Sequence, residues 1–124
     1  MRLVKIAVAS VNTTVGAFVS NVDRAIATAE AMAGEDATVG AFQEQLVSGY
    51  PAEDLVQWRS FVERQWTELT RFAQRTMSLP TVFVLGVTVN RLGATKSPLR
   101  PGSKRRRFDN SNRGSRLLVT YGDR

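Results

Sequence analysis

Short apolar runs alternate with helical apolar stripes along residues 1–90, and this alternation constrains the fold more than any other feature. Leu3 to Ala9 is mostly apolar and precedes a polar loop, which is typical of a strand buried on both faces. Thr38 to Phe42 is a second short apolar run, and Leu79 to Val89 is a third one, rich in β-branched residues. We therefore expect three strands.

Between these runs, apolar residues recur at every third or fourth position, the spacing of one helix face. The first such stripe, which Gly34 is suited to end, consists of Phe18, Val22, Ile26, Ala29 and Ala33. A second helix is expected from Pro51, because proline suits the first turn and acidic residues there complement the helix dipole. Its stripe, interrupted at most once, consists of Leu55, Trp58, Val62, Trp66, Leu69 and Ala73.

This β-α-β-α-β order predicts an α/β protein with helices packed on a parallel or mixed sheet. The 124 residues suffice for one domain with a modest core. Three strands seldom complete such a sheet, because both edges need cover and one face is left without a partner. We therefore expect exposed apolar surface, with aggregation or a molten character unless a partner covers it.

Charge divides the chain into two parts. Residues 1–90 carry seven basic and nine acidic side chains, whereas residues 91–124 carry ten basic and two acidic ones. The second part has no clear periodicity, contains a basic cluster at Lys104 to Arg107, and offers only Leu117 to Tyr121 as a weak strand. We predict that residues 91–124 form a disordered basic tail.

The abrupt change after Val89 leaves three explanations open: out-of-frame translation of a GC-rich gene, an evolved basic tail, or a truncated domain with a neutral terminus. A genuine tail would attract nucleic acid only through Lys104 to Arg107. Without interleaved aromatic residues, such a cluster supports no more than nonspecific phosphate binding.

The sequence contains no cysteine and no histidine, so disulfides, thiolate nucleophiles and the usual zinc ligand sets are excluded. Chemistry must come from carboxylates, lysines or hydroxyls, and we predict no metal site. Lys5 splits the N-terminal apolar run, which leaves it too short for a secretion signal. No run reaches membrane-spanning length. We expect a cytoplasmic protein with no membrane partner.

Glu44 follows the second predicted strand by two residues. In open α/β sheets, ligands bind beyond the carboxyl ends of the strands. Two interpretations remain open: Glu44 is a solvated loop or helix-capping residue, as most carboxylates are, or it is a general base.

The segments KIAVASVNTTVGAFVSNVDRAIATAEAM and VGAFQEQLVSGYPAEDLVQW resemble the opening of the nitrilase-type (carbon-nitrogen hydrolase) glutaminase domain of glutamine-dependent NAD synthetases. The usual family string is a strand ending in Phe-Pro-Glu, an apolar residue, then Gly-Tyr-Pro and an acidic pair before a leucine. The spacing from Glu44 to Tyr50 and on to Glu53 and Asp54 matches. The resemblance covers residues 3–89, the front part of such a domain.

The resemblance implies the first β-α-β-α-β portion of an α-β-β-α sandwich, with Glu44 as general base of a Glu-Lys-Cys triad. Its carboxylate would take the thiol proton as cysteine attacks the glutamine amide, while lysine stabilises the oxyanion. Tyr50 would lie near the glutamine pocket. The glutaminase part needs no cofactor, and its ammonia passes to a separate synthetase domain that uses ATP and Mg to convert deamido-NAD to NAD.

Two departures limit the resemblance. Gln43 replaces the usual proline, which loosens a fixed φ and leaves Glu44 less well oriented. The chain also lacks the triad cysteine, and the triad lysine belongs to a segment beyond the third strand, so we predict no activity from this chain alone. Expected partners are a synthetase domain or further copies of the chain. The alternatives are a non-enzymatic module that binds nucleic acid or a partner through its tail, and the same fold acting on another amide or nitrile.

Overall fold

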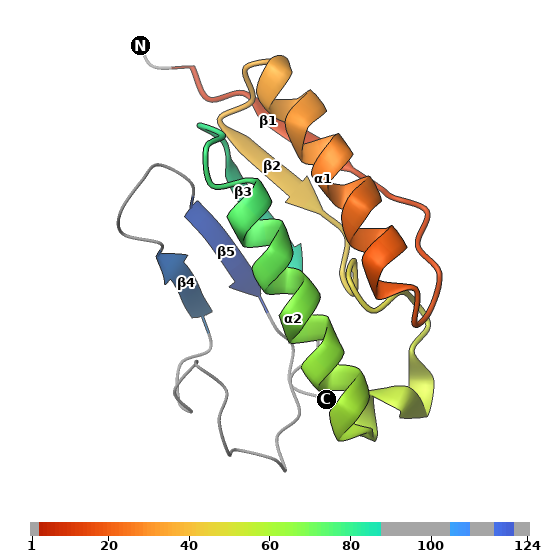
Figure 1. The fold of residues 1–124 in the computed structure, drawn as a ribbon. Helices are drawn as coiled ribbons and strands as arrows, with labels where there is room; N and C mark the ends of the chain where they lie inside the picture. Colours follow the sequence, from red (N-terminus) through yellow and green to blue (C-terminus); the bar gives the residue numbers. More distant parts are fainter. Residues whose placement is uncertain (1–2, 88–104, 110–115, 121–124) are drawn as a thin grey trace.

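A computed structural model describes residues 3–87, 105–109 and 116–120, which form one sheet with two helices on one face (Figure 1). The three strands and two helices expected within residues 1–90 are all present. The strands are β1 Ile6–Ala9, β2 Val39–Phe42, β3 Val82–Gly86, β4 Arg105–Asp109 and β5 Arg116–Thr120. The helices are α1 Phe18–Gly34, the short 3₁₀ helix η1 Glu53–Gln57, and α2 Arg59–Arg75. The α/β class is therefore confirmed.

The sheet has the strand order β1-β2-β3-β5-β4. All neighbouring pairs run parallel except β4 and β5, which are antiparallel. Strand β5 coincides with the weak strand expected at Leu117 to Tyr121, but β4, over most of the basic cluster, was not predicted. The remainder of the predicted disordered tail lies outside the described residues.

Aromatic rings fill the space between the sheet and the helices. Phe42 of β2, Phe72 of α2 and Phe83 of β3 pack on one another, with ring centroids 5.8 to 6.2 Å apart. Gly40 of β2 leaves room for Met32 and Phe83, because a Cβ there would lie 2.6 Å from the Met32 sulfur and 2.9 Å from the Phe83 ring. The core therefore requires glycine at position 40 for packing rather than for backbone freedom.

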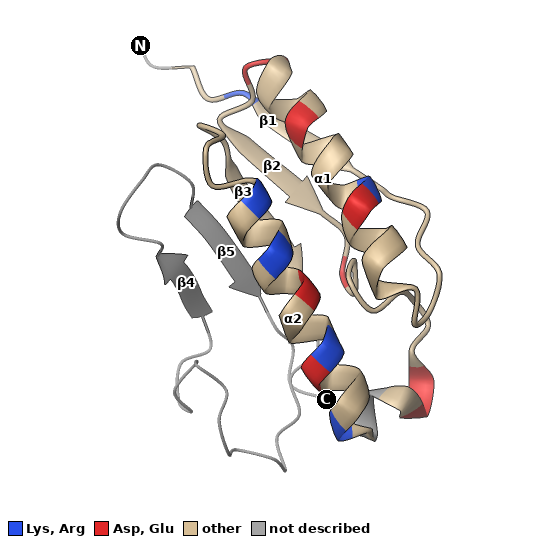
Figure 2. Ribbon diagram, viewed as in Figure 1, with Lys and Arg blue, Asp and Glu red and all other residues tan. Residues whose placement is uncertain are grey.

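The two helices are also joined directly. Arg71 of α2 donates hydrogen bonds to Asp23 Oδ1 (2.7 Å) and to the Val19 carbonyl oxygen (3.0 Å) of α1, and to Glu68 Oε2 (2.6 Å). The bond to Asp23 contributes most to raising the pKa of Arg71, while burial opposes it. Basic and acidic residues occur along the length of both helices (Figure 2).

The predicted break in the second helix falls at Trp58. Its backbone is extended (φ −83°, ψ 119°), and it separates η1 from α2. Trp58 is therefore 60% exposed rather than part of the apolar stripe, whereas Trp66 is partly buried against the core. No helix of the described part is long and apolar enough to cross a membrane.

The prediction that the first strand is buried on both faces is wrong. β1 is an edge strand, with Ile6 64% and Val8 81% exposed. Their register partners on β2 and β3 are half-buried and continue the same surface. We call this surface the open face, and it consists of Ile6, Val8, Val39, Ala41, Val82 and Val84. The expectation of one uncovered apolar face is confirmed for the described residues.

Candidate functional site

Glu44 lies at the carboxyl edge of the parallel strands, two residues after β2 ends. Because β1, β2 and β3 run parallel, the segments that follow them emerge at this same edge. The segments after β1 and β2 lie side by side there (Figure 1), and the Gly16 N–H donates to the Ser48 carbonyl oxygen at 2.9 Å. The edge therefore brings two loops together around Glu44.

Glu44 rests against the end of β3. A Cβ built on Gly86 would lie 3.0 Å from Glu44 Cα and 3.2 Å from its Cγ, so the two residues are in close contact. Glu44 is nevertheless exposed, which leaves its carboxylate oxygens free to accept hydrogen bonds from solvent or a ligand.

The turn after Glu44 is compact. Gln45 has a left-handed backbone (φ 55°), and its carbonyl oxygen accepts a 2.8 Å hydrogen bond from the Gly49 N–H. Gly49 also has positive φ (83°), and a Cβ there would lie 2.6 Å from the Val15 nitrogen. Only glycine combines that conformation with so close an approach. The turn is thus packed directly on the loop that follows β1.

A buried amide joins the same two loops to α1. Asn21 is fully buried; its Oδ1 accepts a 2.9 Å hydrogen bond from the Thr14 N–H. Its Nδ2 donates to the carbonyl oxygens of Thr14 (2.8 Å) and Val47 (3.0 Å). One side chain therefore satisfies three main-chain groups, and the turn that carries Glu44 is held to the helix layer.

Two polar oxygens of the turn stay available. Gln45 Oε1 and Ser48 Oγ are buried and have no hydrogen-bond partner among the described residues. Buried polar atoms in folded proteins are usually paired with protein or water. These two atoms are therefore the places in the turn where water or a polar ligand group would be accommodated without displacing an existing bond.

Tyr50, the second residue singled out from the sequence, is 65% exposed at the end of this turn. Phe42 is turned the other way, into the aromatic core. The described residues thus leave the Glu44 side chain open to solvent rather than enclosed by aromatic neighbours.

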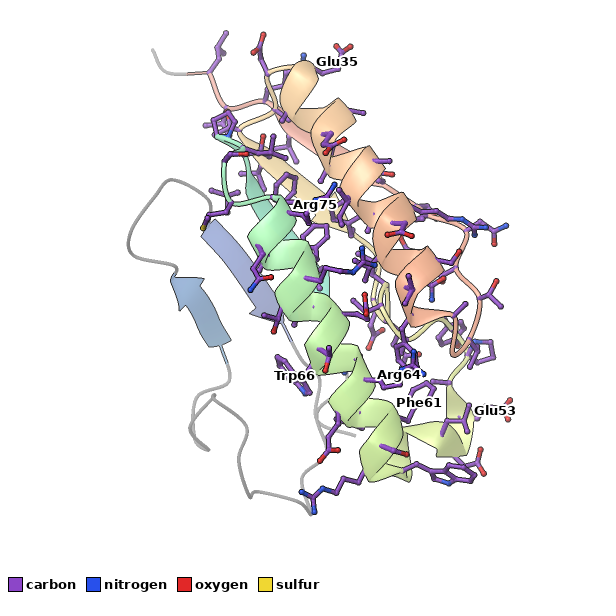
Figure 3. The ribbon with its side chains drawn as sticks, viewed as in Figure 1. Glu35, Glu53, Phe61, Arg64, Trp66 and Arg75 are labelled. Carbon is purple, nitrogen blue, oxygen red and sulfur yellow. The ribbon has the colours of Figure 1, made fainter. Side chains whose placement is uncertain are left out.

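Lys5 is the one lysine among the described residues, and it lies far from Glu44. Lys5 precedes β1, whereas Glu44 follows the parallel β2. Lys5 therefore lies at the amino ends of the strands and Glu44 at their carboxyl ends. Its Nζ donates to the Glu35 carbonyl oxygen. Glu35 lies at the opposite end of the molecule from Glu53 (Figure 3). Lys5 therefore provides no cation for Glu44.

Sequence reasoning located Glu44 but missed the residues that hold it. Nothing in the sequence singles out Gly49 or Gly86. Asn21 could have been noticed, because a polar residue next to the apolar Val22 of the helix stripe can indicate a buried hydrogen-bonding side chain. Gln43 was expected to loosen the backbone, yet its side-chain amide binds both main-chain groups of Val11.

The fold and site together define an α/β protein with a fixed turn that carries an exposed carboxylate at the carboxyl edge of its sheet. No family model matches the chain. Over 86 residues it is 30% identical to the glutamine-dependent NAD(+) synthetase of Thermotoga maritima. The match covers 69% of this chain and 15% of that protein, and it supports a relation to glutamine-dependent NAD synthetases. Any stretch of 86 residues within 124 includes residues 39–86, so Glu44 lies inside the match.

Proposed function

We propose that this chain is the front part of a glutaminase domain of the nitrilase type, and that Glu44 is its general base. The observation that carries the proposal is the position of Glu44: it sits at the carboxyl edge of a parallel sheet, against Gly86, within the segment matched to an NAD synthetase. The turn that carries Glu44 is held in addition by contacts with the loop after β1 and with α1.

In the proposed reaction, the Glu44 carboxylate takes the proton of a cysteine thiol as the sulfur attacks the side-chain amide of glutamine. A lysine stabilises the oxyanion, ammonia leaves, and water then hydrolyses the thioester to glutamate. Tyr50, exposed at the end of the same turn, would border the glutamine pocket. The cysteine and the lysine come from outside this chain.

The proposed setting is cytoplasmic NAD synthesis. We place ATP and Mg on a separate synthetase domain, which would use the released ammonia to convert deamido-NAD to NAD. The glutaminase part itself would need no cofactor. The partner of this chain is then the remainder of a glutaminase domain joined to a synthetase domain, or further copies of the chain.

The test is a chimera in which the 86 matched residues of this chain replace the corresponding segment of the Thermotoga relative. We expect glutamine-dependent NAD formation, and a loss of about 100-fold or more in kcat with Glu44→Gln, as for removal of a general base. NAD formation from added ammonium should persist in the same variant, which shows that the synthetase domain is intact. Glu30→Gln, an exposed carboxylate on α1, is the matched control. Full glutamine-dependent activity in Glu44→Gln would exclude the proposed role.

The isolated chain should be inactive. Since it has no cysteine, it cannot form the thioester, and no ammonia should be released from glutamine above the buffer rate. A coupled ammonia assay on the purified chain measures this. Ammonia release that Glu44→Gln abolishes would show that a different mechanism operates.

The competing class is a non-enzymatic module that binds nucleic acid. One observation favours it: Arg105 to Arg107 lie on β4, at the outer edge of the sheet. Binding of this kind weakens steeply as salt rises and disappears when residues 91–124 are deleted. Titration of a labelled RNA or DNA at two salt concentrations distinguishes it from the glutaminase proposal.

A further inference from the structure

The side chain of Gln43 forms a two-bonded clamp on the loop after β1. The Val11 N–H donates to Gln43 Oε1 at 2.9 Å, and Gln43 Nε2 donates to the Val11 carbonyl oxygen. One amide thereby satisfies both main-chain groups of one residue across 32 positions of sequence. A carboxamide is suited to this task because it carries a donor and an acceptor side by side.

The clamp begins where backbone pairing ends. The last register pair between β1 and β2 is Ala9 with Phe42, and Gln43 is the next residue. Val11 lies beyond the last register pair, and the Gln43 side chain makes the hydrogen bonds that a neighbouring strand would otherwise make with it. Two residues later the chain reverses through the left-handed Gln45. Glu44 is therefore fixed on one side by the clamp and on the other by the turn.

We propose that Gln43 is a positioning residue for Glu44: its two hydrogen bonds to Val11 fix the main chain immediately before Glu44. The role assigned to Glu44 rests on the proposed function, whereas the clamp and its effect on the position of Glu44 do not. The two are therefore tested separately.

Gln43→Glu turns the clamp into a pH-dependent one. A protonated carboxyl group keeps one donor and one acceptor, like the amide, but an ionised one has no donor and faces the Val11 carbonyl oxygen. The folded state thus favours the protonated form and raises the pKa of the introduced carboxyl group. Its contribution to stability is present below the ordinary Glu pKa and is lost as pH rises through the raised value.

Two NMR signals of the full chain report on the proposal. Hydrogen exchange at the Val11 amide measures the clamp, and the nuclear Overhauser effect between Glu44 Hγ and Gly86 Hα measures the position of Glu44, since these groups touch. In Gln43→Glu we expect both signals to match those of the unmodified chain at pH 4. At pH 7 the carboxylate repels the Val11 carbonyl oxygen, and we expect this repulsion to open the clamp. Exchange at Val11 should then be about 5-fold faster than in the unmodified chain at the same pH, as when a net hydrogen bond of ~1 kcal/mol is removed, and the Overhauser effect between Glu44 and Gly86 should disappear.

Gln74→Glu, the same change at an exposed glutamine of α2, is the matched control and should alter neither signal. If exchange at Val11 accelerates while the Overhauser effect between Glu44 and Gly86 persists, Gln43 is only a structural residue and the proposal is overturned. Unchanged exchange at pH 7 also overturns it. The amide of Phe72, a buried residue inside α2, is followed in the same spectra, and its continued protection at pH 7 shows that the chain is still folded.

Kinetics give a second readout in an active chimera. There Gln43→Leu should lower kcat for glutamine about 10-fold and leave KM unchanged, because a misplaced base affects the chemical step. An unchanged kcat would overturn the positioning role. The chimera could instead be inactive while the Overhauser effect between Glu44 and Gly86 still depends on Gln43. That result would count against the proposed function but not against the positioning role of Gln43.

Discussion

The two faces of the sheet use the same strands but differ in what lies over them. On the helix side, Phe42 and Phe83 are buried with Phe72 of α2, whereas on the open face Val8 is 81% exposed. Strands with apolar residues on both faces are typical of sheets covered on two sides. The described chain covers one. Substitutions on the helix side should therefore mainly change the free energy of unfolding, and substitutions on the open face should mainly change association between copies of the chain.

The strongest test of this comparison is Phe72→Ala. Removing a fully buried ring from the aromatic core should lower the free energy of unfolding by about 3–5 kcal/mol. Urea titration followed by circular dichroism measures it. Val84→Ala, on the open face, is the paired control and should cost under about 1.5 kcal/mol, since Val84 is only half-buried. Equal losses in the two variants would mean that the open face is covered after all.

A neighbouring pair of residues on β2 sharpens the contrast. Gly40→Ala adds a methyl group toward the core, where a Cβ would lie 2.9 Å from the Phe83 ring, and should cost about 1–3 kcal/mol. Ala41→Val adds two methyl groups on the open face and should change stability by less than about 0.5 kcal/mol. Thermal unfolding of both variants measures the two changes in stability. A smaller cost at position 40 than at position 41 would contradict the assignment of the faces.

Local periodicity explains what the sequence could predict. The spacing of apolar residues in α1 and the short runs of β1, β2 and β3 depend only on residues close in sequence, and Glu44 lies two residues after the end of β2. The burial of β1 was mispredicted because it depends on a covering layer rather than on β1 itself. β4 was missed because it pairs only with β5 and has no apolar alternation of its own.

The support of Glu44 depends on interactions that no local pattern records. Gln43 binds a residue 32 positions away, and Gly86 matters only because Glu44 lies on it. From the sequence, Gln43 counted only as a departure from the resemblance. Its role emerges only when the side chain is seen to bind Val11.

A smaller effect is expected from the link within the covered layer. Arg71→Met removes the hydrogen bonds to Asp23 and Val19 that join α2 to α1, together with the bond to Glu68 inside α2. It should cost about 0.5–1 kcal/mol because the ion pair with Asp23 is partly exposed. Salt should lower the stability of the unmodified chain more than that of the variant. Arg59→Met, which breaks an exposed pair with Glu63 inside α2, is the control and should have little effect.

The smallest effect on stability and the clearest effect on association should come from Val8→Thr. Threonine keeps the β-branched shape and strand preference of valine, and the side chain is 81% exposed, so the free energy of unfolding should change by less than about 0.5 kcal/mol. The apolar area on the open face falls, however, and concentration-dependent association seen by sedimentation should weaken. Val19→Thr, exposed on α1, should leave association unchanged. If Val8→Thr destabilised the chain as Phe72→Ala does, β1 would be buried in the protein in solution. If association were equal in both threonine variants, the copies would meet through a surface other than the open face.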